Sequence, residues 1–294
     1  DLAIYVRVFL PNQVFVRTHQ NKFSQALNFN FNQWQNEKGF KKFASHFYNQ
    51  TSFLIDRKIK RNGANFDLNP FSKEEEELIG LNTNFRNSLF FNRGKQHHST
   101  TYSFLLNENQ NLLSVGSVAA KNQSHQLQYQ HLVKKSWLFN LSGSTTSTES
   151  TSENYPNRNF EIDGYQIEPK IGYLFSKNAS WDIFYEFQQK ENQIGAFETL
   201  KQTRLGTSFT FNSEKGFSMN GEFSMYNNSY DGNALSAVGF QMLEGLQPGK
   251  NQTWRLLLQK NLTQYLDVNI NYQGRNSETS KTIHTGNVQL RAFF

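Results

Sequence analysis

Apolar and polar side chains alternate along much of this chain. Residues 27–32 read Leu-Asn-Phe-Asn-Phe-Asn, which places the apolar groups on one face and the carboxamides on the other. A period of two is that of a β-strand, because successive side chains of a strand point to opposite faces. No segment has a comparable helical period. The same alternation recurs in residues 126–131, 137–142, 181–188, 204–211, 217–225, 266–272 and 288–294.

Two kinds of connection separate these strands. Tight turns are predicted at residues 134–136, 177–180, 213–216 and 262–264, and longer polar stretches at 59–76, 109–121, 150–159, 192–199, 231–250 and 277–282. Short and long connections alternate from residue 132 onward, which is typical of an up-and-down meander with tight turns at one rim. With an irregular strand at residues 2–18, interrupted by Pro11, the sequence predicts about fourteen strands, an even number as in bacterial outer-membrane barrels.

A soluble sandwich or lipocalin-like barrel would also alternate, but three features favour a membrane barrel. The predicted strands run to about 11–14 residues, longer than soluble strands of about 5–6 and long enough to cross a bilayer. The polar face is continuous and rich in Asn, Gln, Ser and charged groups. Aromatic residues lie near the strand ends, as in the interfacial girdles of such barrels: Trp34, Tyr48, Trp137, Trp181, Tyr226, Trp254 and Tyr272.

We therefore expect an all-β fold, a transmembrane up-and-down antiparallel β-barrel in which residues 1–294 form a single unit. Its expected location is the bacterial outer membrane, in contact with the lipid bilayer and lipopolysaccharide. Aromatic residues make up 15% of the chain, which excludes a disordered protein, although hydrophobic residues reach only 36% and the mean hydropathy is −0.69. The lack of an apolar run of about 18 residues excludes a helical membrane protein.

Charge and cysteine content narrow the function classes. Thirty Lys and Arg residues against 24 Asp and Glu residues give a net charge of +6. The densest basic segment is residues 57–61, but no recognition helix or zinc finger accompanies it, so we expect no nucleic-acid partner. The absence of cysteine excludes disulfides, thiolate zinc sites and cysteine nucleophiles.

The sequence gives little sign of catalytic chemistry. No serine lies in a nucleophile-elbow motif, and no glycine-rich phosphate loop is present. His97 and His98 have no further metal ligand placed near them, and the acidic run Glu74–Glu77 is interpreted as a solvated loop edge rather than a calcium site. We expect neither an enzyme nor a metal or cofactor site.

Alternation also predicts which charged side chains point into the lumen. Both signs occur on neighbouring strands, which favours mutual neutralisation across a narrow, wet interior. The alternative is a selectivity track for small solutes. The predicted lumen-lining charges are Arg86, Glu168, Lys170, Asp182, Glu186, Arg204, Glu222, Arg255, Asp267 and Arg291.

The last strand ends the chain on an aromatic residue. Val288, Leu290, Ala292 and Phe294 share one face, with polar residues between them. A terminal aromatic residue on an alternating strand resembles the signal that barrel-assembly machineries recognise by strand pairing at an edge. We therefore expect Phe294 to be an assembly signal and the barrel-assembly machinery to be a partner during biogenesis.

Three further segments carry a family resemblance. Residues 242–251 read Met-Leu-Glu-Gly-Leu-Gln-Pro-Gly-Lys-Asn, residues 271–275 match Asn-Tyr-x-Gly-Arg, and residues 283–286 read Ile-His-Thr-Gly. Over about residues 77–294 the chain resembles the C-terminal β-barrels of large Bacteroidota outer-membrane proteins, most of which have no assigned activity. The resemblance implies a barrel, an outer-membrane location and a longer chain of which this is the C-terminal part.

The segment of residues 242–251 lies in the longest predicted loop. It is apolar and then turn-forming, so it could plug the extracellular mouth, dock a partner, or merely connect two strands. The docking candidates are Met242, Leu243, Glu244, Leu246 and Pro248.

Two functions follow from these patterns. The first is a membrane anchor and docking subunit of a larger envelope assembly, with envelope proteins as partners and a link to protein export or outer-membrane biogenesis. The second is a diffusion pore or transporter for small hydrophilic or amphipathic solutes.

Overall fold

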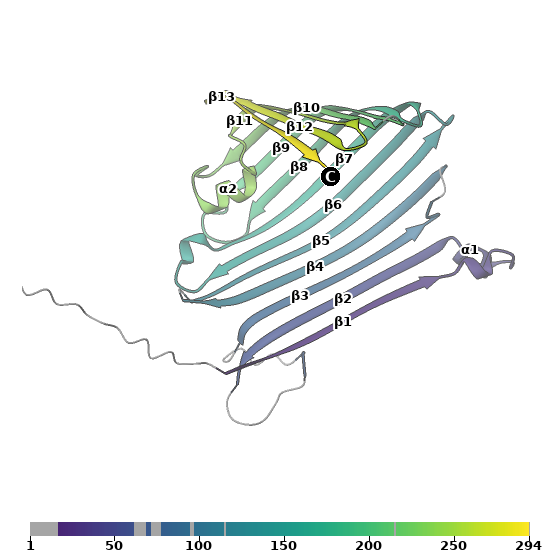
Figure 1. The fold of residues 1–294 in the computed structure, drawn as a ribbon. Coiled ribbons are helices and arrows are strands. Elements are labelled where there is room, and N and C mark those ends of the chain that lie inside the picture. Colours follow the sequence, from purple (N-terminus) through teal and green to yellow (C-terminus); the bar gives the residue numbers. More distant parts are fainter. Residues whose placement is uncertain are drawn as a thin grey trace, which may run out of the picture.

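The computed structural model describes residues 17–61, 69–71, 78–94, 97–114, 116–214 and 216–293. They form one antiparallel sheet of 13 strands, in which each strand pairs with its neighbours in the chain (Figure 1). The prediction of an all-β, up-and-down antiparallel sheet is confirmed. The strands are β1 (Thr18–Asn30), β2 (Phe47–Lys60), β3 (Leu78–Phe91), β4 (His98–Leu113), β5 (Gly116–Val133), β6 (Trp137–Ser152), β7 (Phe160–Ser176), β8 (Ala179–Asn192), β9 (Thr199–Ser213), β10 (Phe217–Asp231), β11 (Gly249–Thr263), β12 (Leu266–Ser277) and β13 (Ser280–Ala292).

The helical segments of the described chain are short and lie in the connections. Among the described residues, no helix has the length and apolar character that a membrane crossing requires. The segments are the 3₁₀ turns η1 (Asn32–Trp34) and η2 (Pro156–Arg158) and the α-helices α1 (Phe40–Ala44) and α2 (Ala237–Leu243).

The sheet is open between its first and last described strands, so the described residues do not form the predicted closed barrel. The reason is strand direction. In a meander of 13 antiparallel strands, β1 and β13 run the same way, and they cannot pair antiparallel with each other. The predicted strand at residues 2–18, which brought the expected count to about fourteen, falls almost wholly on residues 1–16. Those residues, like Phe294, lie outside the described residues.

The two rims of the sheet differ, but less than the sequence predicted. Tight turns follow β5, β7 and β11, and in the first of them Lys134 and Lys135 both have positive φ, as in a type I′ hairpin turn. At the other rim, residues 153–159, 193–198 and 232–248 are longer connections. The predicted loops at 109–121 and 277–282 are mostly strand, because β4, β5, β12 and β13 continue there. Residues 277–282 are polar on both faces, and residues 109–121 mix polar and apolar residues without strict alternation, so paired strand resembled loop.

Strand alternation separates two faces of opposite character. On β8, Trp181, Ile183 and Tyr185 each keep 44% of their surface exposed, whereas Phe184 and Glu186, at alternate positions of the same strand, are buried. We call the face of Phe184 and Glu186 the inner face, because α2 packs on it, and the opposite one the outer face. Large apolar side chains on the outer face are exposed across the sheet, from Phe29 on β1 to Val288 on β13.

The inner face is polar, and its polarity follows the strand register. One row of paired positions carries only carboxamide and hydroxyl side chains from β1 to β10. The row consists of Asn28, Gln50, Ser88, Ser103, Gln126, Ser144, Gln166, Gln188, Gln202 and Asn228.

The connection of residues 232–248 folds back onto the inner face. Its helix α2 begins at Ser236, whose Oγ accepts a hydrogen bond from the Gly239 backbone N–H at 2.9 Å, and ends at Glu244 in the left-handed conformation. The buried side chains that join this helix to the sheet form a small apolar core. They are Ile162, Leu200, Val238, Met242 and Leu243.

A second contact joins β11, β12 and β13 on the outer face. The indole of Trp254 lies across Gly274, where a Cβ would stand 2.3 Å from two ring carbons. The indole N–H donates to the Tyr272 hydroxyl at 3.3 Å, and that hydroxyl contacts His284 Nδ1 at 2.8 Å. Only glycine leaves room for the indole at position 274, so this packing depends on it.

We expect Gly274→Ala to destabilise the sheet by about 1–3 kcal/mol, the usual cost of overpacking, because the added methyl group displaces the Trp254 ring. Urea unfolding of the refolded chain measures the change. Gly286→Ala is the matched control, since Gly286 lies on β13, pairs with Tyr272, and has open space where its Cβ would be. Equal losses in the two variants would contradict the packing explanation.

Candidate functional site

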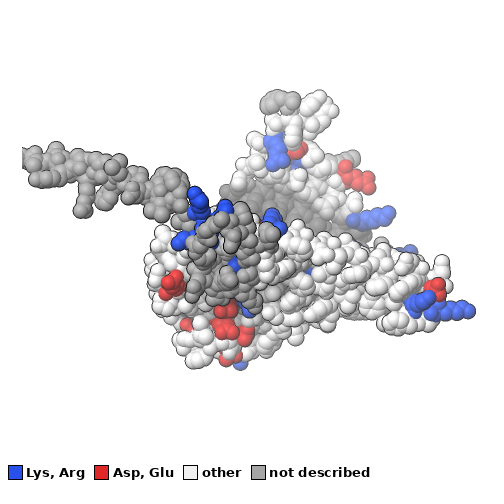
Figure 2. All heavy atoms as spheres, turned by 90° about the horizontal axis from the view of Figure 1, so that it is seen from below, with Lys and Arg blue, Asp and Glu red and all other residues white. Residues whose placement is uncertain are grey.

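The inner face divides into a neutral and a charged part. On β4, β5 and β6 the inward positions carry no charged residue, and runs such as Asn140, Ser142, Ser144 and Thr146 are typical of them. From β7 onward both signs appear on neighbouring strands. In the space-filling view, the molecule is hollowed and its charged groups are scattered in small sets of mixed sign (Figure 2). Both signs also occur on the inner face of β1 and β2, where Lys22 is the register partner of Asp56, so the mixed-sign prediction applies on both sides of the neutral strands β4 to β6.

Arg204 on β9 is the centre of the charged part. Its Nη2 donates to Glu222 Oε1 at 2.5 Å, its Nη1 donates to Glu186 Oε2 at 3.4 Å, and its Nε donates to Ser224 Oγ at 3.1 Å. Glu186, Arg204 and Glu222 come from three adjacent strands, β8, β9 and β10. Together with Ser224 of β10, these three residues form what we call the Arg204 cluster. It is a network of charge-assisted hydrogen bonds, which are stronger than neutral ones.

Aromatic rings hold the Arg204 guanidinium in place. It lies 4.6 Å from the centre of the Phe184 ring and 5.3 Å from that of Tyr226, within the range of cation–π attraction. The Phe184 ring in turn covers Gly206, where a Cβ would stand 2.2 Å from a ring carbon. Glycine at 206 is therefore what lets the ring lie flat beneath the guanidinium.

A second ion pair lies beside the Arg204 cluster. Lys170 Nζ is 3.4 Å from Asp182 Oδ2, and Gly172, the partner of Asp182 across the strands, leaves the room that this carboxylate occupies. The structure thus places five of the predicted lumen charges of β7 to β10 in two neighbouring sets, the Lys170–Asp182 pair and the Arg204 cluster.

Other predicted charges lie apart from these two sets. Arg86 is exposed on β3, where its cross-strand partners are Ser52 and Leu105. Asp267 and Arg291 are partners of each other at the tight-turn end of β12 and β13. They belong to the inner face by register, but they make no ion pair with the Arg204 cluster in the described part of the chain.

The predicted docking residues differ in burial and in their partners. Met242 and Leu243 are fully buried in the core under α2, so they cannot form a docking surface. Glu244 pairs with Lys190 of β8, whose Nζ also donates to the Met242 carbonyl at 3.2 Å. Alternation with Glu186 marks Lys190 as inward-facing, although sequence reasoning did not single it out. Leu246 and Pro248 remain partly exposed.

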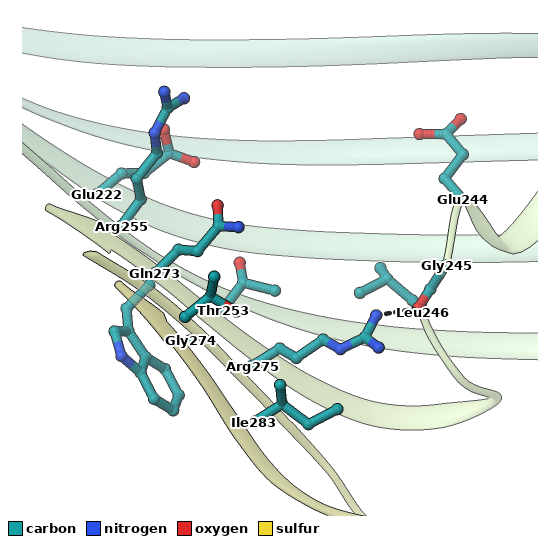
Figure 3. A pocket seen from close by; sticks show the side chains of 12 residues that line it. Glu222, Glu244, Gly245, Leu246, Thr253, Arg255, Gln273, Gly274, Arg275 and Ile283 are labelled. Atoms are coloured by element: carbon teal, nitrogen blue, oxygen red, sulfur yellow. Dashed lines mark hydrogen bonds between the residues drawn. The ribbon is translucent and has the colours of Figure 1, made fainter. Parts of the chain in front are cut away.

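A pocket of about 450 Å³ lies between this segment and the sheet (Figure 3). Its floor consists of two adjacent register rows, one with Glu222, Arg255, Gln273 and Thr285, the other with Thr253, Arg275 and Ile283. Glu244, Gly245 and Leu246 form its roof. Arg275 connects floor and roof, because its Nη1 donates to the Gly245 carbonyl at 3.1 Å.

The pocket unites the three segments on which the family resemblance depends. Gly245 belongs to the first, Arg275 to the second, and Ile283 and Thr285 to the third. Sequence reasoning named Arg255 but missed Arg275, Gln273 and Thr285 as site residues. Their inward phase on β12 and β13 was a signal that could have found them.

The site combines ion pairs with uncharged hydrogen-bonding side chains. Among the residues that the structure describes, no group of three or more His, Asp or Glu side chains is placed to hold a metal ion. The acids of the site accept hydrogen bonds from cations, and the two arginines of the pocket are its charged donors.

Comparisons with known proteins give no family for this chain. No protein-family model matches it, and no curated protein matches it. Among solved structures, the β domain of the Bordetella autotransporter BrkA shares 7% identity, with 84% of this chain and 92% of that chain covered. The translocator domain of NalP from Neisseria meningitidis shares 7%, with 94% and 87% covered. The transport unit of AIDA-I from Escherichia coli shares 9%, with 98% and 93% covered. All three superpose with a TM-score of 0.31, too low to support an argument about this chain.

We expect Arg204→Gln to destabilise the protein by about 1–3 kcal/mol, the usual cost of leaving a partly buried hydrogen-bonding group without its partner, because Glu186 and Glu222 lose their cation. Urea unfolding measures the loss. Arg86→Gln should have little effect, since no ion pair of Arg86 occurs in the described chain. If charge is the cause, adding Glu186→Gln to Arg204→Gln should restore part of the stability. A double variant whose loss of stability equals the sum of the two single losses would contradict the charge explanation.

Proposed function

We propose that this chain is an outer-membrane β-barrel that serves as membrane anchor and docking subunit of a larger envelope assembly, linked to protein export or outer-membrane biogenesis. The observation that carries the membrane location is the outer face. Trp137, Phe139, Leu141 and Ile171 on β6 and β7 keep between 39% and 49% of their surface exposed. A continuous exposed apolar surface of this kind needs lipid or protein to cover it.

Two further features support lipid as the cover. The strands have 12 to 18 residues, more than the roughly 9–11 that a tilted strand needs to cross a bilayer. At the tight-turn rim, Phe43 of α1 packs edge-on against Phe47 at 5.2 Å, while Phe40 keeps 79% of its surface exposed beside Lys41 and Lys42. Rings next to lysines suit the interface of a membrane.

The proposal includes closure of the sheet by a fourteenth strand. In lipid, unpaired backbone N–H and C=O groups at the edges of β1 and β13 would each cost several kcal/mol. One strand antiparallel to both edges satisfies them, since β1 and β13 run the same way. The sequence of residues 2–10, Leu-Ala-Ile-Tyr-Val-Arg-Val-Phe-Leu, is rich in strand-forming residues and immediately precedes Pro11.

A docking role needs an exposed surface away from lipid, and the rim of the longer connections has one. Tyr155, Ile194, Phe197, Leu235 and Phe240 are all exposed there. Phe197 has φ of 55°, a costly conformation for a bulky residue, and its ring keeps 62% of its surface exposed. These five residues, the rim patch, take the place of Met242 and Leu243 as docking candidates for an envelope protein.

A diffusion pore is the alternative. The row of carboxamide and hydroxyl side chains along the inner face of β1 to β10 would suit the wall of a water-filled channel. Helix α2 and the Arg204 cluster occupy part of this same inner face, on β7 to β10, which favours the anchor over an unobstructed pore.

Cysteine pairs test the closed barrel, and the chain offers no cysteine of its own to interfere. We expect Tyr5→Cys to form a disulfide, in lipid vesicles, with one of Thr285→Cys, Asn287→Cys or Gln289→Cys on β13. Reducing and non-reducing electrophoresis measure it. Ser144→Cys at the middle of the sheet should form none. Crosslinks only between copies of the chain would contradict closure by its own segment.

Pull-down from native membranes in mild detergent tests the docking role. We expect the native chain to retain envelope proteins that a Phe197→Ser/Leu235→Ser/Phe240→Ser variant loses, because the apolar rim patch is gone. Tyr265→Ser is the control, since Tyr265 is equally exposed at the opposite rim. A strictly monomeric native chain that forms reproducible open channels in planar bilayers would favour the pore instead.

A further inference from the structure

The Arg255 and Arg275 side chains line a pocket whose two carboxylates are paired with other cations. Glu222 accepts from Arg204 at 2.5 Å and also from Ser224 Oγ at 3.3 Å. Glu244 at the roof is paired with Lys190. Neither carboxylate of the pocket is therefore free of a cation, and the charge of the two arginines is only partly balanced.

The two arginines have few partners in the described part of the chain. Arg275 gives one N–H to the neutral carbonyl of Gly245 at 3.1 Å, which fixes its direction but leaves its charge uncompensated. Within the described residues, Arg255 has no salt bridge, although Glu222 is its partner across the strands. Both side chains line the pocket from different ends: Arg275 reaches the Gly245 backbone, whereas Arg255 lies beside Glu222 (Figure 3).

The rest of the lining can donate hydrogen bonds or contact carbon. Thr253, Gln273 and Thr285 add two hydroxyl groups and an amide, while Leu246 and Ile283 add apolar surface. The volume of about 450 Å³ lies within the usual range of small-molecule sites, roughly 300–1,000 Å³. A matching ligand is an acceptor-rich anion with a short carbon skeleton.

We infer that this pocket, the Arg255–Arg275 pocket, binds a small organic acid with two carboxylates, one for each arginine. The planar guanidinium presents paired N–H donors that match the two oxygens of a carboxylate. The apolar surface of Leu246 and Ile283 favours an acid with a carbon skeleton over inorganic phosphate. The inference goes beyond the proposed function, because the pocket is complete within β10 to β13 and residues 244–246, whether or not a partner binds the rim patch.

Equilibrium titration of the refolded full chain in detergent tests the inference, with succinate as the probe. We expect saturable binding of one succinate per chain. Arg255→Gln and Arg275→Gln should each weaken it by about tenfold or more, as expected for loss of a charge-assisted hydrogen bond. Arg275→Lys should also weaken it strongly, because lysine keeps the charge but lacks the fork.

Three comparisons complete the experiment. Arg291→Gln is the matched control, since Arg291 is an arginine on the same face at the far end of β13, and its binding should equal that of the native chain. Heat-modifiable mobility on gels establishes that each variant has folded. The inference is overturned if succinate does not bind saturably, if neutral succinamide binds as well, if inorganic phosphate binds more tightly than succinate, or if both Gln variants bind like the native chain.

Discussion

The backbone ladder is the constraint on which the rest of this structure depends. Every internal strand from β2 to β12 must satisfy its N–H and C=O groups on both sides, and the antiparallel register that does so also fixes which side chains share a face. The charged group around Arg204, the neutral carboxamide row and the exposed apolar surface are all consequences of that register. A slip of one residue in a single strand would exchange its apolar and polar faces.

Period-two alternation therefore predicted the fold class, the inward direction of the charges and the mixed sign of those on β7 to β10. It could not predict closure, because alternation describes each strand and not the partner of an edge. It also placed loops at 109–121 and 277–282, where apolar and polar residues do not alternate although the backbone is paired. Polar side chains indicate contact with water or with a polar lumen, whereas backbone pairing depends on the neighbouring strand. The side-chain pattern and the backbone pairing therefore differ where a strand extends beyond its apolar residues.

The site was predicted in part for a similar reason. The inward phase identifies Arg204, Glu186 and Glu222 as neighbours in principle, but their contact depends on glycines that no charge pattern reveals. Gly206 admits the Phe184 ring beneath the guanidinium, and Gly172 admits the Asp182 carboxylate. Met242 and Leu243 were expected at a docking surface because an apolar run in a loop has no local partner. The partner is the sheet itself, where Ile162 and Leu200 meet the run from strands distant in sequence.

The position of α2 explains why the charged sector is also the covered one. A helix that packs on a polar inner face must bury its apolar side without stranding the polar groups beneath it. Here Lys190 resolves the conflict, since it donates to the Met242 carbonyl at the end of the helix and pairs with Glu244 just beyond it. On β4 to β6 the inward Ser, Thr, Asn and Gln side chains offer no such charged partner for a folded-back loop. The position of the inward charges thus explains both features: α2 covers strands that supply a charged partner, and β4 to β6, which supply none, stay uncovered.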